Sequence, residues 1–215
     1  MVICKFTKTD SAVYLPHLDL LREMGRAVRR ADLSVKFSEG FNPHMLLYFS
    51  QPLPLGLSSL AEYFCADSEE DPEHFRTELN RKLPRGVRIL AASHCEKASV
   101  HAEITHAEYR YKAEKPFKKS DLEHIMSRIT LEIPVKTKKG MTVSDVRARI
   151  FSLEEDRGDA VAVLGCGRDN LRADSFGAFL SSELGCGEWS VEKEESLILS
   201  EAGLRSVDEV YDIKA

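Results

Sequence analysis

The order of the elements that the sequence predicts is the feature that most constrains the fold. Short runs typical of strands are separated by longer segments whose apolar residues recur at helical spacing. Each half of the chain gives the same order: strand, helix, three strands, helix, strand. The first half places strands at 2–6, 35–37, 45–50, 62–66 and 87–91, with helices at 16–31 and 72–82. The second half places strands at 103–112, 130–136, 146–153, 160–164 and 191–199, with helices at 118–128 and 173–184.

This repeated order predicts an α+β protein made of two tandem ferredoxin-like units, each with helices on one face of an antiparallel sheet. We place the first unit at 1–98, the second at 99–200 and an acidic tail at 201–215. The alternative is a single α+β domain with a long insertion. A hydrophobic fraction of 43% and a charged fraction of 30% exclude wholesale disorder, so either arrangement gives a folded chain.

The sequence also indicates the cellular compartment in which we expect the protein. No apolar run approaches the roughly 20 residues that cross a bilayer, and the first ten residues do not form a signal-peptide core. We therefore expect a cytoplasmic protein with no membrane partner. The cysteines are never spaced as CxxC, which favours reduced thiols over disulfides or a zinc site, so we expect no metal and no cofactor. They are Cys4, Cys65, Cys95, Cys166 and Cys186.

The helix predicted at 16–31 carries several arginines, which we call the arginine ridge. We expect Leu18, Leu21 and Val28 to face the core and the guanidinium groups to line the other face. Because guanidinium groups bind phosphates bidentately, the ridge predicts contact with RNA. The alternative is neutralisation along the helix by Asp19 and Glu23. The ridge consists of Arg22, Arg26, Arg29 and Arg30.

A second basic region lies in the middle of the chain. Residues 110–149 carry 11 basic and 5 acidic side chains, whereas residues 150–215 carry 6 basic and 15 acidic side chains. The local charge of such a region affects a binding partner more than the net charge of -5 does. We expect Lys138 and Lys139, at a hairpin tip, and Arg147 to contact RNA phosphates, although exposed turns are often lysine-rich without binding anything. We expect no DNA partner.

Tyr109 and Tyr111 alternate with Arg110 and Lys112 on one predicted strand. The two tyrosines therefore share one face of the sheet and the two cations share the other. An aromatic face on such a sheet can stack unpaired bases, and the alternative is that both tyrosines pack in the core.

The loop after the first helix is predicted to be rigid, because Gly40 permits positive φ and Pro43 holds Asn42 extended. Glu39 and His44 on this loop, together with His17 and Asp19, are candidates for general acid–base catalysis. A plain structured turn explains the loop residues equally. The spacing from 17 to 44 matches no compact metal-ligand signature. The candidate binding loop consists of Ser38, Glu39, Gly40, Phe41, Asn42, Pro43 and His44.

Several ordered segments resemble the radical SAM-linked protein family, a bacterial domain of unknown function. The segments are 14–22 (YLPHLDLLR), 26–31 (RAVRRA), 37–44 (FSEGFNPH) and 52–56 (PLPLG), followed by Ser59 and Glu62. The resemblance is strongest over about the first 65 residues and continues in 138–140 and 145–147. Pro16 stands where the family favours a small residue, and Met45 stands where a second proline is frequent.

The resemblance implies an accessory role. Members of the family occur alone or joined to the carboxyl end of radical SAM proteins, which implies a radical SAM protein as partner and RNA as its associated substrate. The chain lacks the CxxxCxxC triplet that holds the iron–sulfur cluster of such enzymes. We therefore expect an RNA-binding or substrate-positioning accessory protein more than a self-contained enzyme. The alternatives are an RNA-processing enzyme with a His/Asp/Glu site and a protein-binding adaptor without RNA contact.

Overall fold

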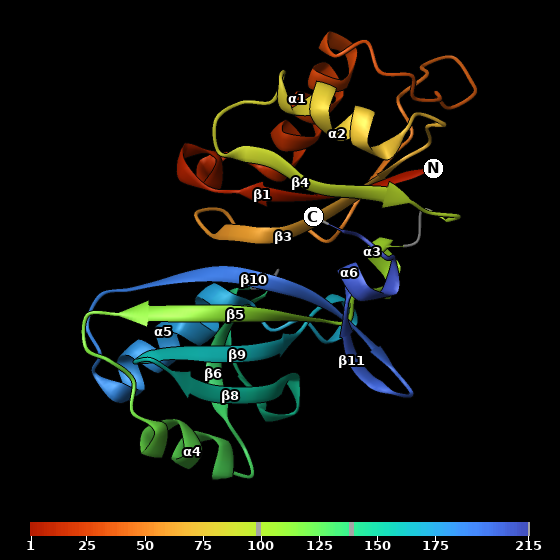
Figure 1. The fold of residues 1–215 in the computed structure, drawn as a ribbon. Helices are drawn as coiled ribbons and strands as arrows, with labels where there is room; N and C mark the ends of the chain where they lie inside the picture. Colours follow the sequence, from red (N-terminus) through yellow and green to blue (C-terminus); the bar gives the residue numbers. More distant parts are fainter. Residues whose placement is uncertain (98–99, 138–139, 215) are drawn as a thin grey trace. The chain divides into compact units, whose positions relative to one another are not determined.

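A computed structural model describes residues 1–97, 100–137 and 140–214 of the chain. The chain forms two compact units, the first from Met1–Ile104 with Ser196–Ala215 and the second from Thr105–Glu195 (Figure 1). Each unit combines an antiparallel sheet with helices, so the predicted α+β class is confirmed. The ferredoxin-like detail of the two units stays a prediction. Within the described ranges, no helix is both long and apolar enough to cross a membrane.

The first unit places two helices on one face of its sheet (Figure 1). The strand order is β4-β1-β3-β2, and each neighbouring pair is antiparallel. The elements of the unit, in chain order, are β1 (Val2–Lys8), the 3-10 helix η1 (Asp10–Tyr14), α1 (His17–Arg30), β2 (Leu47–Phe49), β3 (Ser58–Ala66), α2 (Pro72–Asn80), β4 (Val87–His94), α3 (Val100–Glu103), the end of β10 (Trp189–Ser200), β11 (Gly203–Ser206) and α6 (Val207–Val210).

The core of this unit joins α1 and α2 to alternate residues of the strands. The buried residues of α1 follow the helical repeat, at Leu20, Met24, Ala27 and Val28. The prediction that Leu18 faces inward is wrong, because Leu18 lies about 200° around the helix from Leu20 and its side chain is 65% exposed. Val28 is buried, as predicted, and Leu21 is half-buried.

The segment that we predicted as an acidic tail returns to the first unit as β11 and α6. The carboxylate of Asp208 on α6 accepts a hydrogen bond from Lys5 Nζ at 2.6 Å and another from the Tyr63 hydroxyl at 2.8 Å. These contacts attach α6 to β1 and β3. The chain thus leaves the first unit after residue 104 and re-enters it at residue 196, whereas we placed the boundaries at 98 and 200.

The second unit has the strand order β10-β5-β9-β8 and a separate β6–β7 hairpin. A 3-10 helix, η2, occupies the start of the strand that we predicted at 146–153, because the Asp145 carboxylate accepts the backbone N–H of Arg147 and turns the chain. The elements of the unit are β5 (His106–Ala113), α4 (Lys119–Ser127), β6 (Glu132–Thr137), β7 (Gly140–Asp145), η2 (Arg147–Arg149), β8 (Ile150–Asp156), β9 (Asp159–Gly165), the 3-10 helix η3 (Gly167–Asp169), α5 (Ala173–Leu184) and the first part of β10.

Tyr109 and Tyr111 pack in the core of the second unit. Both side chains are buried, and the Tyr111 hydroxyl donates a hydrogen bond to the carbonyl of Ala173 at 3.1 Å. The Tyr111 ring also contacts Phe176 edge to face. These tyrosines therefore offer no free aromatic face for stacking a base.

Candidate functional site

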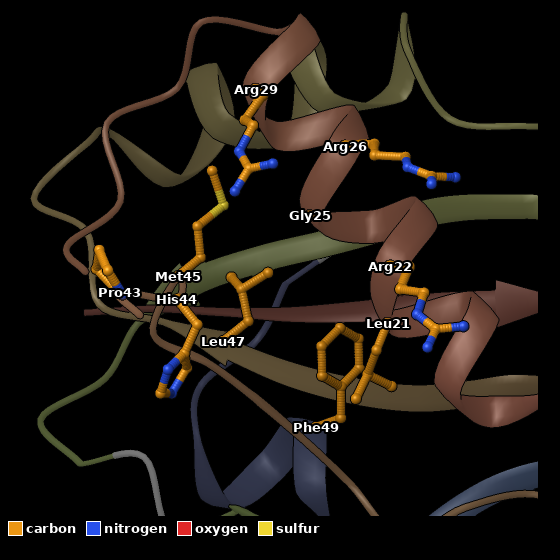
Figure 2. A pocket seen from close by; sticks show the side chains of 10 residues that line it. All are labelled: Leu21, Arg22, Gly25, Arg26, Arg29, Pro43, His44, Met45, Leu47 and Phe49. Atoms are coloured by element: carbon orange, nitrogen blue, oxygen red, sulfur yellow. The ribbon is translucent and has the colours of Figure 1, made fainter. Parts of the chain in front are cut away.

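A recess of about 410 Å³ lies in the first unit, between α1 and the chain that runs from the candidate binding loop into β2 (Figure 2). Its volume falls in the range of sites for small ligands, about 300–1,000 Å³. Basic side chains come from α1 and apolar side chains from the facing segment. The recess is lined by Leu21, Arg22, Gly25, Arg26, Arg29, Pro43, His44, Met45, Leu47 and Phe49.

Arg22, Arg26 and Arg29 line this recess from α1. In Figure 2 the Arg29 side chain extends toward Met45, whereas those of Arg22 and Arg26 extend away from Pro43 and His44. Arg22 pairs with Asp19 at 2.8 Å and Arg26 pairs with Glu23 at 2.5 Å. The alternative of neutralisation by carboxylates on the same helix therefore holds for two of the three arginines. Both pairs are exposed, and such pairs typically contribute only about 0–1 kcal/mol. Among the described residues, no carboxylate pairs with Arg29. The recess therefore offers one unpaired guanidinium group and two held by weak ion pairs.

Gly25 lies among these arginines on the recess side of α1 (Figure 2). A glycine in the interior of a helix costs about 0.5–1 kcal/mol relative to alanine. A Cβ atom built on Gly25 meets no heavy atom within 4 Å, so packing does not require the glycine. What the glycine provides is space against the helix backbone at the recess.

Hydrogen bonds between its two ends close the candidate binding loop. The backbone N–H of Ser38 donates to the carbonyl of His44 at 2.9 Å, and the Ser38 hydroxyl lies 2.8 Å from Nδ1 of His44. Gly40 has a φ of 111°, the positive value that we expected of it. Only Pro43 and His44 of this loop line the recess. The loop thus fixes the His44 ring at the rim of the recess.

A second, much smaller cavity of about 10 Å³ shares Phe49 with the recess as a wall residue. Lys8 and Glu62 line it although their side chains are only 2% and 4% exposed. The Glu62 carboxylate accepts a hydrogen bond from the Ser59 hydroxyl at 2.8 Å. A cavity of this size holds about one water molecule. The cavity is lined by Phe6, Lys8, His17, Leu20, Phe49, Ser50, Leu53 and Glu62.

The charged groups of this small cavity influence one another. Burial lowers the pKa of Lys8, and the nearby Glu62 carboxylate opposes that shift. Burial also lowers the pKa of His17; Glu62 raises it and Lys8 lowers it further. The lowered pKa of His17 favours the neutral imidazole, which can accept a proton at one ring nitrogen and donate one at the other.

The model of a family described as an uncharacterized protein conserved in bacteria, DUF2344, matches residues 2–173 of the chain. The chain belongs to the DUF2344 family. Every residue that lines the recess or the small cavity falls within the matched segment. No curated protein matches the chain.

The four catalytic candidates occupy different places in this DUF2344 chain. His44 lines the recess, whereas His17 lines the small cavity. Asp19 pairs with Arg22, and Glu39 lines neither space. Across the described residues, no group of three or more His, Cys, Asp and Glu side chains is arranged to hold a metal ion. The acid–base groups that do come together are His17, Lys8 and Glu62.

The remaining predicted phosphate contacts lie elsewhere. Arg30 turns from the recess and donates a hydrogen bond to the carbonyl of Lys82 at 2.9 Å. In the second unit, the Arg147 guanidinium group donates to the carbonyls of Met126 and Ile150, at 2.9 and 3.2 Å. Lys138 and Lys139 lie outside the described residues. The predicted RNA contacts that line the recess are thus the first three arginines of the ridge.

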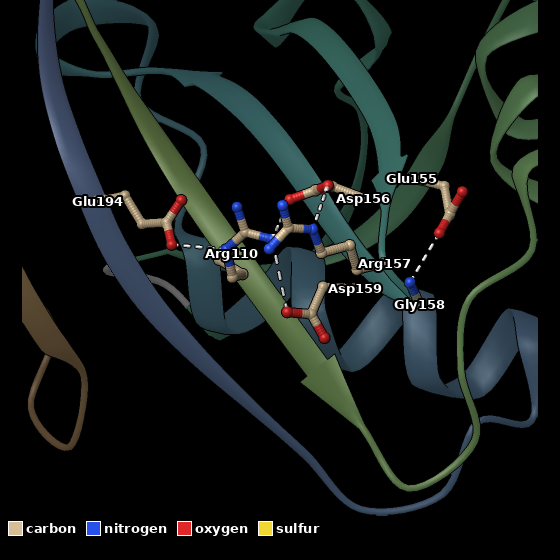
Figure 3. A network of polar contacts seen from close by, with 7 residues as sticks. All are labelled: Arg110, Glu155, Asp156, Arg157, Gly158, Asp159 and Glu194. Atoms are coloured by element: carbon tan, nitrogen blue, oxygen red, sulfur yellow. Dashed lines mark hydrogen bonds and ion pairs between the residues drawn. The ribbon is translucent and has the colours of Figure 1, made fainter.

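In the second unit, three carboxylates surround the guanidinium group of Arg110 (Figure 3). Its guanidinium group contacts Glu194 at 2.6 Å, Asp156 at 2.8 Å and Asp159 at 3.5 Å. The hydrogen bond that Arg110 donates to the Glu194 carboxylate is the largest cause of a raised pKa for Arg110. The cation is already balanced, so this face is a weaker candidate for phosphate binding than the recess.

Our sequence reasoning missed Lys8, Glu62 and Gly25 as site residues. In a strand every second residue faces the same side of the sheet, so Lys8 on β1 faces the same side as Cys4 and Phe6. Because Cys4 and Phe6 pack in the core, this two-residue repeat was the available signal that Lys8 faces inward. Glu62 was part of the family-like segment, but nothing in the sequence places it beside Lys8.

Proposed function

We propose that the first unit binds single-stranded RNA in the recess and positions it for a radical SAM enzyme. The supporting observation is that three guanidinium groups and an apolar floor share one recess. The radical SAM partner rests on the family-like segments in the first 65 residues, and the RNA contact rests on the recess itself.

The rim of the recess suits the RNA backbone. Guanidinium groups form charge-assisted, bidentate hydrogen bonds with phosphate oxygens. Arg29 is available without breaking an ion pair, and a phosphate can exchange with the exposed carboxylates that hold Arg22 and Arg26. The spacing of these residues along α1 lets one short stretch of backbone reach all three.

The floor of the recess suits an unpaired base. Met45, Leu47 and Phe49 present apolar surface, and the fixed His44 ring lies at the rim. Proteins that recognise RNA by sequence usually take bases that are splayed out of single strands and pack them on apolar or aromatic side chains. About 410 Å³ accommodates one nucleotide and excludes a duplex.

The test is a salt titration of RNA binding. Three phosphate contacts to a single strand predict a slope of about -2 in log Kobs against log salt, or about a 20-fold loss of affinity from 50 to 200 mM salt. The double variant Arg26→Glu with Arg29→Glu should abolish most of the binding and flatten the slope. Arg81→Glu is the matched control, because Arg81 is 64% exposed and pairs with Glu78, as Arg26 is 62% exposed and pairs with Glu23.

The proposal is wrong if the double variant and the control bind RNA equally well, or if structured and single-stranded cellular RNAs show no affinity at low salt. The partner is tested separately, by copurification with a radical SAM enzyme from a bacterium that encodes both. If the enzyme copurifies without RNA and the double variant retains it, the protein is an adaptor.

A further inference from the structure

Two cysteine side chains meet on one face of the sheet of the first unit. Cys65 on β3 lies opposite Ile3 of β1. Cys95, directly after the end of β4, donates its backbone N–H to the carbonyl of Met1. Residues 1 and 3 share a face of β1 because side chains alternate along a strand, so both cysteines point to that face. Their sulfur atoms lie 3.9 Å apart.

The two cysteines differ in their access to solvent. Cys65 is fully buried, whereas Cys95 is half-buried. The helix α3 packs on β3, and the backbone of Val100 at its start forms a hydrogen bond with the Cys65 sulfur. A small reagent in solution therefore reaches Cys95 first, and it reaches Cys65 through the neighbouring sulfur.

The contact between the sulfur atoms also makes the two thiols unequal as acids. The hydrogen bond between them lowers the pKa of Cys95 and raises the pKa of Cys65. Burial raises the pKa of Cys65 further. The thiolate is the form of cysteine that attacks oxidants and alkylating reagents. The pair thus has one accessible sulfur that ionises more readily, and one protected thiol beside it.

We propose that Cys65 and Cys95 form a dithiol site that reacts with hydrogen peroxide and is oxidised to a disulfide. Cysteines that react with peroxide typically combine an accessible attacking sulfur with a neighbouring cysteine that resolves the product. In the resting state both thiols are free. The proposal does not rest on RNA binding, because the residues of β1 that pack against α1 and α2 are the even-numbered ones, on the other face of the sheet.

The reaction balances with peroxide as the oxidant. The Cys95 thiolate attacks one peroxide oxygen, the O–O bond breaks, and the other oxygen leaves as hydroxide and takes up a proton to become water. The Cys65 sulfur then attacks the sulfur of the Cys95 sulfenic acid, the S–S bond forms, and the hydroxyl group leaves with the Cys65 proton as a second water. The two thiols together lose two hydrogens and two electrons.

The disulfide requires a limited movement. The two sulfur atoms must close from 3.9 Å to about 2.05 Å. Cys95 lies beyond the last residue of β4, so this approach leaves the paired part of β4 in place.

The experiment treats the reduced full chain at pH 7 with limiting hydrogen peroxide, blocks the unreacted thiols with iodoacetamide, and maps the peptides by mass spectrometry without reduction. The main product should be a peptide pair joined through Cys65 and Cys95, about 2 Da lighter than the two reduced peptides together. Cys166, which is also half-buried, should be oxidised several-fold more slowly. Equal oxidation of Cys166, or sulfinic acid at Cys95 without the joined peptides, overturns the proposal.

Substitutions separate the roles of the two sulfur atoms, with folding checked by thermal melting. In Cys65→Ala, peroxide should leave Cys95 as a sulfenic acid that dimedone traps. Alkylation of Cys95 by iodoacetamide should slow several-fold in this variant, because the hydrogen bond that lowers its pKa is lost. Cys166→Ala is the matched control and should form the disulfide at the original rate. An unchanged alkylation rate in Cys65→Ala would refute the activation of Cys95 by its neighbour.

Discussion

Replacing Gly25 with alanine should stabilise the protein and weaken RNA binding at the same time. Gly25 lies in the interior of α1, where alanine gains about 0.5–1 kcal/mol of helix stability. The new methyl group meets no heavy atom within 4 Å, so no packing penalty offsets that gain. We expect Tm to rise by about 1–4 °C. The methyl group occupies the recess, and crowding a ligand by one methyl costs about 1 kcal/mol, or about a fivefold rise in Kd.

The assay pairs differential scanning calorimetry with fluorescence anisotropy of a labelled single-stranded RNA. His74→Ala is the control, since it raises helix propensity on α2 and does not line the recess. It should stabilise the fold without changing Kd. The reasoning is refuted if Gly25→Ala lowers Tm, because the open space at the helix would then be absent. It is equally refuted if Kd for RNA is unchanged, because RNA would then bind elsewhere.

Three further predictions concern the fold. Gly177→Ala should destabilise the second unit by about 1–3 kcal/mol, measured by urea unfolding, because its Cβ would lie 2.3 Å from the Trp189 ring. Asp208→Asn should weaken the attachment of α6 by about 1–3 kcal/mol through the loss of its charged bond to Lys5, seen as faster hydrogen exchange in 203–211. The Asp145 carboxylate accepts hydrogen bonds from backbone N–H groups, and these bonds lower its pKa. Its contribution to the stability of the fold is therefore present above pH 3.8, the ordinary pKa, and is lost as pH falls through the lowered pKa. Asp145→Ala should therefore lower Tm at pH 7, and the difference should disappear in strong acid.

The local patterns predicted most elements of the first unit, but the strand predicted at 35–37 is only an isolated bridge between Phe37 and Met45. Helical spacing identified α1 and α2, and Pro43 with Gly40 indicated the closed loop, because these signals depend on residues close in the chain. The prediction that Leu18 faces inward was wrong because residues close in the chain do not decide between Leu18 and Leu20. Leu18 and Leu20 are both apolar, and only contact with the strands decides which of them is buried.

The site was predictable only in part. The ridge was visible as a run of arginines, but Arg30 turns to Lys82 while Arg29 enters the recess, and the sequence spacing alone favoured Arg30. His17 and His44, which the sequence suggested as part of one cluster, line two different spaces.

The sequence by itself determined the α+β class, the basic face of α1 and the stiffness of the loop at 38–44, since helix periodicity, charge spacing and glycine or proline geometry act over a few residues. Only the tertiary structure decided that this face and the end of the loop border one recess, and that Lys8, His17 and Glu62 share a cavity. Those groups come from β1, α1 and β3, and strand pairing with helix packing brings them together across 54 residues of chain. No local pattern encodes such a distance.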